Sequence, residues 1–88
     1  MFYTYIVLSL KDNTTYIGST SDLIKRMHDH NAGKTKSIKH KLPVKLIYYE
    51  AYLRKTLARK REIELKNNSL KKRELLKRLE IMPPSSSG

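Results

Sequence analysis

Tyr3, Tyr5 and Tyr16 are the first side chains in the chain whose types and spacing could support chemistry. Alternation along an extended strand puts Tyr3 and Tyr5 on the same face. Gly18 follows Tyr16 closely and allows a ligand or a neighbouring strand to approach the backbone. Tyrosine also has a high preference for strands. Each of the three therefore has a structural interpretation, as filler of a small sheet surface, beside the functional one.

Arg26 and His30 are one helical turn apart, so their side chains are neighbours. They share a face with Leu23 and Met27, which we expect to turn toward the sheet. A guanidinium and an imidazole beside an apolar stripe are reasonable at the rim of a cleft. There, arginine can hold a phosphate through two parallel hydrogen bonds, and histidine can transfer protons near neutral pH. The competing interpretation is a solvated arginine and an inert histidine at the edge.

Residues 54–78 contain eleven basic side chains and only three glutamates, which include Glu62 and Glu64. Glu62 shares a helix face with Ala58 and Leu65. A lone carboxylate that faces a cleft is a reasonable ligand for Mg²⁺, which keeps several waters and needs few protein oxygens. Alternatively, both glutamates only form ion pairs along a charged helix. Periodicity alone does not choose between the two residues.

Other common chemistries lack their residues in this sequence. There is no cysteine, so disulfides and thiolate metal sites are excluded. No Ser-His-Asp order with a nucleophile elbow, no Gly-rich phosphate loop and no helical zinc-protease motif is present. A zinc site would have to join His28 or His30 to the distant His40, which is a weak arrangement.

Two short strands are predicted to carry the tyrosines. Residues 3–10 are rich in Tyr, Thr, Ile and Val, which suit a pleated, half-buried surface. A polar turn at residues 11–13 precedes a second strand at residues 14–18. So short a connection favours an antiparallel hairpin.

A helix is predicted to carry Arg26 and His30. Ser21 or Asp22 can cap its start, it runs to about Asn31, and Gly33 can terminate it. Residues 34–41 predict a basic, polar loop. Residues 43–52 return to strand character. The pattern alternates, with Val44, Leu46 and Tyr48 on one face and Lys45, Ile47 and Tyr49 on the other.

From Arg54 onward the pattern is helical, with an imperfect apolar stripe that is interrupted near Asn68. Ser69 can cap a last helix that runs through Leu79. The predicted order is strand, strand, helix, strand, helix, helix, which is typical of an α+β domain with helices covering a small, largely antiparallel sheet. We expect one domain over residues 1–80 and a flexible tail at residues 81–88.

The charge balance points to a polyanionic partner. The 88 residues carry 19 Lys and Arg against 8 Asp and Glu, a formal net charge of +11. Nucleic acid is the first candidate, followed by an anionic membrane surface and an acidic protein. The opening apolar run is too short to span a bilayer, and no basic stretch precedes it as in a secretion signal. We therefore expect a cytoplasmic protein without a membrane segment.

Five sequence features, in this order and spacing, resemble the motifs of the GIY-YIG nucleases, above all their small stand-alone bacterial members: Tyr3-Thr4-Tyr5, Tyr16-Ile17-Gly18, Arg26, His30 and Glu62. The likeness runs from Phe2 to about Leu79. Five elements in register are much more specific than the Tyr-Ile-Gly triplet alone. The resemblance implies a small three-stranded antiparallel sheet flanked by helices. It also implies a phosphodiester hydrolase that uses one divalent cation, Mg²⁺ or Mn²⁺.

The resemblance implies catalytic roles for Tyr5, Tyr16, Arg26, His30 and Glu62. Tyr16 would help to deprotonate the attacking water, supported by Tyr5, and Arg26 would bind the scissile phosphate. His30 would assist proton transfer or orient the tyrosine, and Glu62 would hold the metal. A free tyrosine has a pKa near ~10 and is a poor base at neutral pH, but nearby cations favour the phenolate.

The resemblance selects Glu62 over Glu64, because Glu62 precedes an apolar-Lys pair as the family's glutamate does. The sequence departs from the family in two places. Tyr3 stands at the first glycine position, as it often does in stand-alone members, and only Asn67 and Asn68 are candidates for the family's late asparagine.

Nucleic-acid affinity would have to come from the chain's own basic surface, for which we predict Lys36, Lys39, Lys41 and Lys66. We expect weak sequence preference, strong salt dependence and DNA rather than RNA as substrate. Branched, nicked or single-stranded DNA in repair or recombination is the expected target, with a targeting protein as a further partner. The alternatives are a non-catalytic nucleic-acid-binding module that kept the fold and a basic domain that binds an acidic protein.

Overall fold

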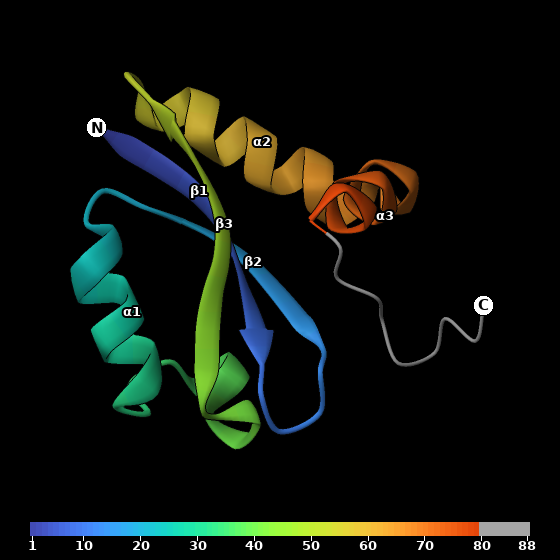
Figure 1. Cartoon of the computed structure of the whole chain (residues 1–88). Helices are drawn as coiled ribbons and strands as arrows, with labels where there is room; N and C mark the ends of the chain where they lie inside the picture. The colour runs from blue at the N-terminus through green and yellow to red at the C-terminus, as the bar shows by residue number, and fades with distance from the viewer. Residues whose placement is uncertain (80–88) are drawn as a thin grey trace.

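The computed structural model describes residues 1–79, so the predicted tail lies outside the described residues, as do the side chains of Lys36 and Ser37. The elements in chain order are β1 (Phe2–Ser9), β2 (Thr15–Thr20), α1 (Leu23–Asn31), η1 (Lys36–Lys41), β3 (Val44–Tyr52), α2 (Lys55–Asn67) and α3 (Ser69–Arg78) (Figure 1). The predicted α+β class is confirmed. The segment predicted as a loop at residues 34–41 contains the short 3₁₀ helix η1.

The sheet is three-stranded with the order β2-β1-β3, and both strand pairs are antiparallel. β1 and β2 form the predicted hairpin. Asn13 in its turn has a φ of 60°, a left-handed conformation that asparagine tolerates better than most residues. The first strand therefore lies in the centre of the sheet.

The central strand is buried on both of its faces, because helices cover both sides of the sheet. Figure 1 shows α1 and α3 on opposite sides of the strands. On the α1 side the buried cluster consists of Tyr5, Val7, Ile38 and Val44. On the other side it consists of Ile6, Ile17, Leu65, Leu75 and Leu76. This double burial explains why residues 3–10 read as a nearly continuous apolar run.

A β-bulge interrupts the pairing of β3 with β1. Ile6 pairs with Tyr48 but Val7 pairs with Leu46, so the register shifts by one residue between them. Leu46 packs in the cluster on the α1 side, whereas Ile47 and Tyr48 pack in the cluster under α2 and α3. The predicted alternation, with Leu46 and Tyr48 on one face, is therefore wrong, because an extra residue reverses the phase of a strand.

Side-chain caps define where α1 and α3 begin. Asp22 caps α1 by accepting a hydrogen bond from the backbone nitrogen of Lys25 at 3.0 Å. Asn68 caps α3 in the same way, accepting from Lys71 at 3.1 Å. The predicted cap at Ser69 is wrong by one residue, because Asn68 has the extended backbone that a cap requires and Ser69 is already helical.

Candidate active site

Tyr5 and Gly18 face each other across the β1–β2 pair, and the tyrosine ring lies over the glycine. A Cβ atom at position 18 would lie only 2.5 Å from the Tyr5 hydroxyl oxygen. The side chain of Tyr5 is thereby buried, with 2% of the residue exposed. A larger residue at position 18 would therefore have to displace this ring.

Tyr5 is part of a buried hydrogen-bonded chain with His30 and Thr35. The Tyr5 hydroxyl lies 2.7 Å from Nε2 of His30, and Nδ1 of His30 lies 2.8 Å from Oγ1 of Thr35. His30 is only 1% exposed. The interpretation of His30 as an inert edge residue is therefore wrong, and so is its place at a cleft rim, because it lies beneath the surface.

Burial sets the protonation of this pair. Burial raises the pKa of Tyr5, and the neighbouring Tyr16 adds to the effect. Burial, with a smaller contribution from the Arg26 cation, lowers the pKa of His30. Both groups are therefore neutral at neutral pH, which is what two buried partners in one hydrogen bond require.

Tyr16 lies against this pair and is partly exposed. Its ring meets the His30 ring edge to face, with centroids 5.7 Å apart and planes at 75°. On its other side, the ammonium of Lys66 lies 5.6 Å from the ring centre. Tyr3, in contrast, packs on Tyr49 at 5.9 Å, away from the cluster of Tyr5, His30 and Tyr16.

Glu62 on α2 reaches the strand that carries Tyr16. Its carboxylate accepts hydrogen bonds from Ser19 Oγ at 2.7 Å and from Lys66 Nζ at 2.8 Å. Burial alone would raise the pKa of Glu62, but these two donors and the nearby cations outweigh it, so the pKa is lowered. Glu64 instead binds Arg61 and Lys71, so the two glutamates have different surroundings.

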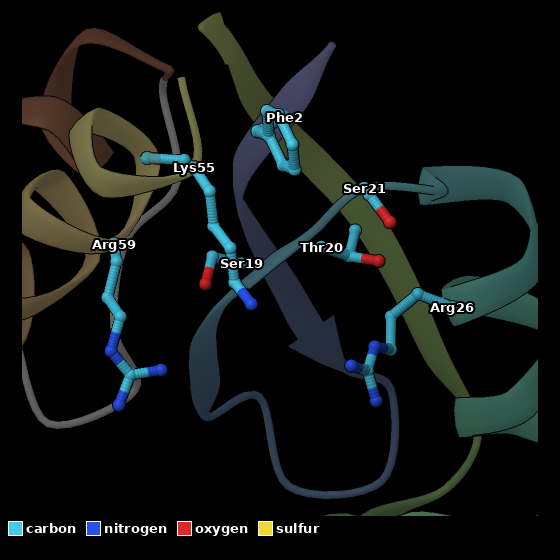
Figure 2. A pocket seen from close by; sticks show the side chains of 8 residues that line it. Phe2, Ser19, Thr20, Ser21, Arg26, Lys55 and Arg59 are labelled. Atoms are coloured by element: carbon cyan, nitrogen blue, oxygen red, sulfur yellow. The ribbon is translucent and has the colours of Figure 1, made fainter.

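These contacts lie along the surface where β2 and α2 meet and run antiparallel, and we call this surface the groove. Tyr16 lies opposite Lys66, and Ser19 lies opposite Glu62. Ser19 also lines a cavity of about 310 Å³ at one end of the groove, together with Phe2, Thr20, Ser21, Arg26, Lys55, Ala58 and Arg59. Figure 2 shows Arg26 on one wall and Lys55 and Arg59 on the other. Arg26 thus lines a cavity, and its role as a phosphate ligand stays a prediction.

A single divalent cation is compatible with Glu62. Residues 1–79 contain no group of three His, Cys, Asp or Glu side chains arranged for a metal. A carboxylate has about four acceptor positions, and two of those on Glu62 are engaged. Mg²⁺ keeps most of its waters and is commonly held by one or two carboxylates, so the remaining positions suffice for it.

The other predicted nucleic-acid contacts are spread over the molecule. Lys66 lies in the groove. Lys41 donates to Thr14 Oγ1 at 2.9 Å, which joins η1 to the β1–β2 turn, and Lys39 is exposed on η1. The side chain of Lys36 lies outside the described part. Neither Lys39 nor Lys41 lines the cavity.

The two candidates for the late asparagine differ in their surroundings. Asn68 uses its side-chain oxygen to cap α3, so it has a structural role. Asn67 is exposed in the last turn of α2.

Four site residues were not singled out from the sequence: Ser19, Thr35, Lys55 and Arg59. The sequence could have indicated Lys55 and Arg59, because they are four residues apart and Arg59 is three residues before Glu62. This spacing places all three on one helix face. Ser19 directly follows the Tyr-Ile-Gly triplet. Thr35 had no signal, since its contact with His30 depends on the path of a loop.

Within residues 1–79, no helix has the length and apolarity needed to cross a membrane.

Comparison with known proteins gives a consistent result. A sequence model described as the GIY-YIG catalytic domain matches residues 1–75. UPF0213 proteins of Streptococcus pyogenes serotypes M5 and M2 are each 42% identical over 74 residues, covering 83% of this chain and 79% of theirs. The solution NMR structure of the UPF0213 protein BH0048 from Bacillus halodurans aligns with a TM-score of 0.54 at 33% identity. That alignment covers 98% of this chain and 92% of the other. The chain therefore belongs to the GIY-YIG family, a family of nucleases that act on nucleic acid and generally use divalent metals.

Proposed function

We propose that this protein is a divalent-metal-dependent endonuclease that hydrolyses phosphodiester bonds in DNA at the groove between β2 and α2. The observation that carries the proposal is a row of contacts from Tyr16 to Lys66 and from Lys66 to Glu62. Ser19, the other partner of Glu62, lines the cavity that also holds Arg26. A base, a carboxylate and a phosphate-binding cation on one groove are the parts that phosphodiester hydrolysis needs.

Each side chain has a distinct task in this proposal. Arg26 binds two oxygens of the scissile phosphate and holds it against the groove floor. Tyr16 acts as the general base for the water whose oxygen attacks phosphorus, while the bond to the leaving oxygen breaks. His30 and the buried Tyr5 fix the ring of Tyr16 through the edge-to-face contact and are positioning residues.

Glu62 is the candidate metal ligand. A Mg²⁺ or Mn²⁺ ion held there would neutralise charge on the phosphate and stabilise the leaving oxygen. Lys66, whose side chain is 44% exposed, can leave the carboxylate without the loss of a buried contact. Ser19 keeps the other carboxylate oxygen in place.

The proposed substrate is branched, nicked or single-stranded DNA in the cytoplasm, in a repair or recombination setting, with a protein partner for targeting. The net charge of +11 supports a polyanion bound mainly through its backbone. Backbone contacts carry no sequence information directly, so the shape of the substrate would decide where the enzyme cuts.

One observation favours a second candidate, a nucleic-acid-binding module without catalysis. Lys66 already neutralises Glu62 at 2.8 Å, so the carboxylate is satisfied without a metal. This candidate predicts salt-sensitive binding and no metal-dependent cleavage.

The first prediction concerns cleavage of a labelled panel of single-stranded, duplex, nicked and branched DNA, with a matched single-stranded RNA. We expect cutting with Mg²⁺ or Mn²⁺, none with EDTA, and loss of turnover in Tyr16→Phe. Arg26→Ala should lower turnover more than affinity, because other cations still hold the backbone. Binding to every substrate with no cutting under any metal condition would favour the non-catalytic module.

A further inference from the structure

The cavity at the end of the groove has the lining of an anion site. Three of its eight lining residues are the cations Arg26, Lys55 and Arg59, three carry hydroxyls, and none is acidic. Lys55 and Arg59 are exposed, and neither forms an ion pair within the described residues. Lys55 and Arg59 lie one helical turn apart and repel each other, so an incoming anion would be stabilised by both.

The order of residues along the groove places this cavity beside the proposed site of cleavage. Tyr16 and Lys66 come first, then Ser19 and Glu62, and then the cavity with Arg59. Along the helix axis, with a rise of about 1.5 Å per residue, Arg59 is about 4.5 Å from Glu62 and Lys55 about 10.5 Å. One strand of B-DNA advances about 3.4 Å per nucleotide, so these cations lie roughly one to three nucleotides from Glu62.

We propose that Lys55 and Arg59 form a subsite for the phosphates that flank the scissile phosphate on one side. The bound strand then follows α2, with Arg26 on the opposite wall of the cavity (Figure 2). A volume of about 310 Å³ is at the lower end of small-molecule pockets and accommodates a stretch of sugar-phosphate backbone rather than a whole protein segment. The position of the scissile phosphate rests on the proposed function. The binding of phosphates by Lys55 and Arg59 does not depend on it.

The test is the salt dependence of binding for the double variant Lys55→Gln/Arg59→Gln. The probes are fluorescein-labelled single-stranded and duplex DNA, followed by fluorescence anisotropy across a salt series with EDTA present. A matched control, Lys60→Gln/Lys77→Gln, removes the same charge from two exposed residues outside the cavity. Circular dichroism checks that all proteins are folded.

We expect the double variant to flatten the slope of log affinity against log salt by about 0.7–0.9 for each lost contact. That corresponds to a roughly tenfold weaker affinity per contact at 0.1 M salt, and the control should change much less. Equal slopes for the double variant and the control would overturn the subsite. Preferential binding of an acidic peptide over both DNA probes would overturn it as well.

EDTA separates this test from the test of catalysis. If the wild-type protein cuts no substrate but the double variant loses its phosphate contacts, the proposed function fails and the subsite stands. If the wild-type protein cuts DNA and the slopes are equal, the subsite alone fails.

Discussion

At the scale of single residues, the contacts of His30 favour one tautomer. If the Tyr5 hydroxyl donates to Nε2, then Nδ1 carries the ring proton and donates to Thr35 Oγ1. Every buried donor then has an acceptor, as buried polar groups require. The opposite tautomer would leave the Tyr5 hydroxyl hydrogen without an acceptor among the described residues. Thr35 therefore holds the His30 ring in this tautomer.

Replacement of Thr35 tests this arrangement. Thr35→Val keeps the shape of the side chain but removes the acceptor, so Nδ1–H is buried without a partner. We expect a loss of about 1–3 kcal/mol in the free energy of unfolding and a shift of the His30 ring toward the Nε2–H tautomer, seen in ¹⁵N NMR. Thr35→Ser is the control and should keep the wild-type tautomer. An unchanged tautomer in Thr35→Val would contradict the assignment.

The lowered pKa of His30 predicts a pH dependence of stability. The ordinary value is 6.5, and burial followed by the Arg26 cation lowers the pKa in the folded state. Between the folded and the ordinary values, the unfolded chain binds more protons than the folded one, so stability rises with pH in that window. Acidification below about 6.5 should therefore reduce the free energy of unfolding.

Urea unfolding across this pH range measures the effect. His30→Gln should show a flatter dependence on pH in the same window, since it lacks the titrating group. If the free energy of unfolding of the His30→Gln variant depended on pH as steeply as that of the wild type, other residues would be responsible for the effect.

At the scale of the elements, Glu50 joins β3 to α2 next to the candidate metal ligand. It accepts a hydrogen bond from Tyr48 at 2.6 Å, another from Tyr52, and one from Nε of Arg61 at 3.0 Å. Arg61 directly precedes Glu62 in the chain and also pairs with Glu64. Tyr48 lies on this face because of the bulge in β3. The bulge and the network therefore place α2, and Glu62 with it, relative to the sheet.

Glu50→Gln should loosen this connection. Burial alone would raise the pKa of Glu50, but the three hydrogen-bonded partners outweigh it and lower the pKa below 4.5. The stability that the carboxylate contributes is thus present above its ordinary value and is lost as the pH falls through the folded value. We expect Glu50→Gln to lower the free energy of unfolding at neutral pH by about 1–3 kcal/mol and to weaken the acid dependence.

Chemical denaturation at neutral and acidic pH measures both effects. Glu74→Gln removes the charge of an exposed glutamate on α3 and is a suitable control. Equal stability of the Glu50→Gln variant and the wild type at neutral pH would mean that the network does not hold α2.

At the scale of the whole molecule, local patterns predicted the elements because they depend on neighbours in the chain. The hairpin and the cap of α1 at residues 21–22 are of this kind, whereas the number of strands in the sheet was implied by the family resemblance. The bulge at Ile47 could not be predicted, because it follows from the pairing of β3 with a strand some forty residues earlier. The cap at Asn68 was misplaced by one residue, since Asn and Ser are equally good caps and only the backbone distinguishes them.

For the candidate site, too, the sequence predicted local features but not those that depend on contacts between distant segments. The Arg26 and His30 spacing correctly put both residues on the face of the apolar stripe, but it did not indicate that His30 would be fully buried under Tyr16. That burial depends on the Tyr5 ring, which lies over Gly18 and contacts His30 through its hydroxyl, a contact between distant segments. Resemblance, not periodicity, separated Glu62 from Glu64, and in the structure the two carboxylates have different partners.

The most direct test of the central claim is metal-dependent DNA cleavage by Glu62→Ala and Glu64→Ala, measured side by side under single-turnover conditions. Both variants lose one negative charge from α2, but only Glu62 faces β2 and the groove. We predict that Glu62→Ala abolishes the Mg²⁺- or Mn²⁺-dependent cutting and that Glu64→Ala retains it. Intact cleavage by a folded Glu62→Ala protein would contradict the account, because the groove contains no other carboxylate among the described residues that could hold the metal.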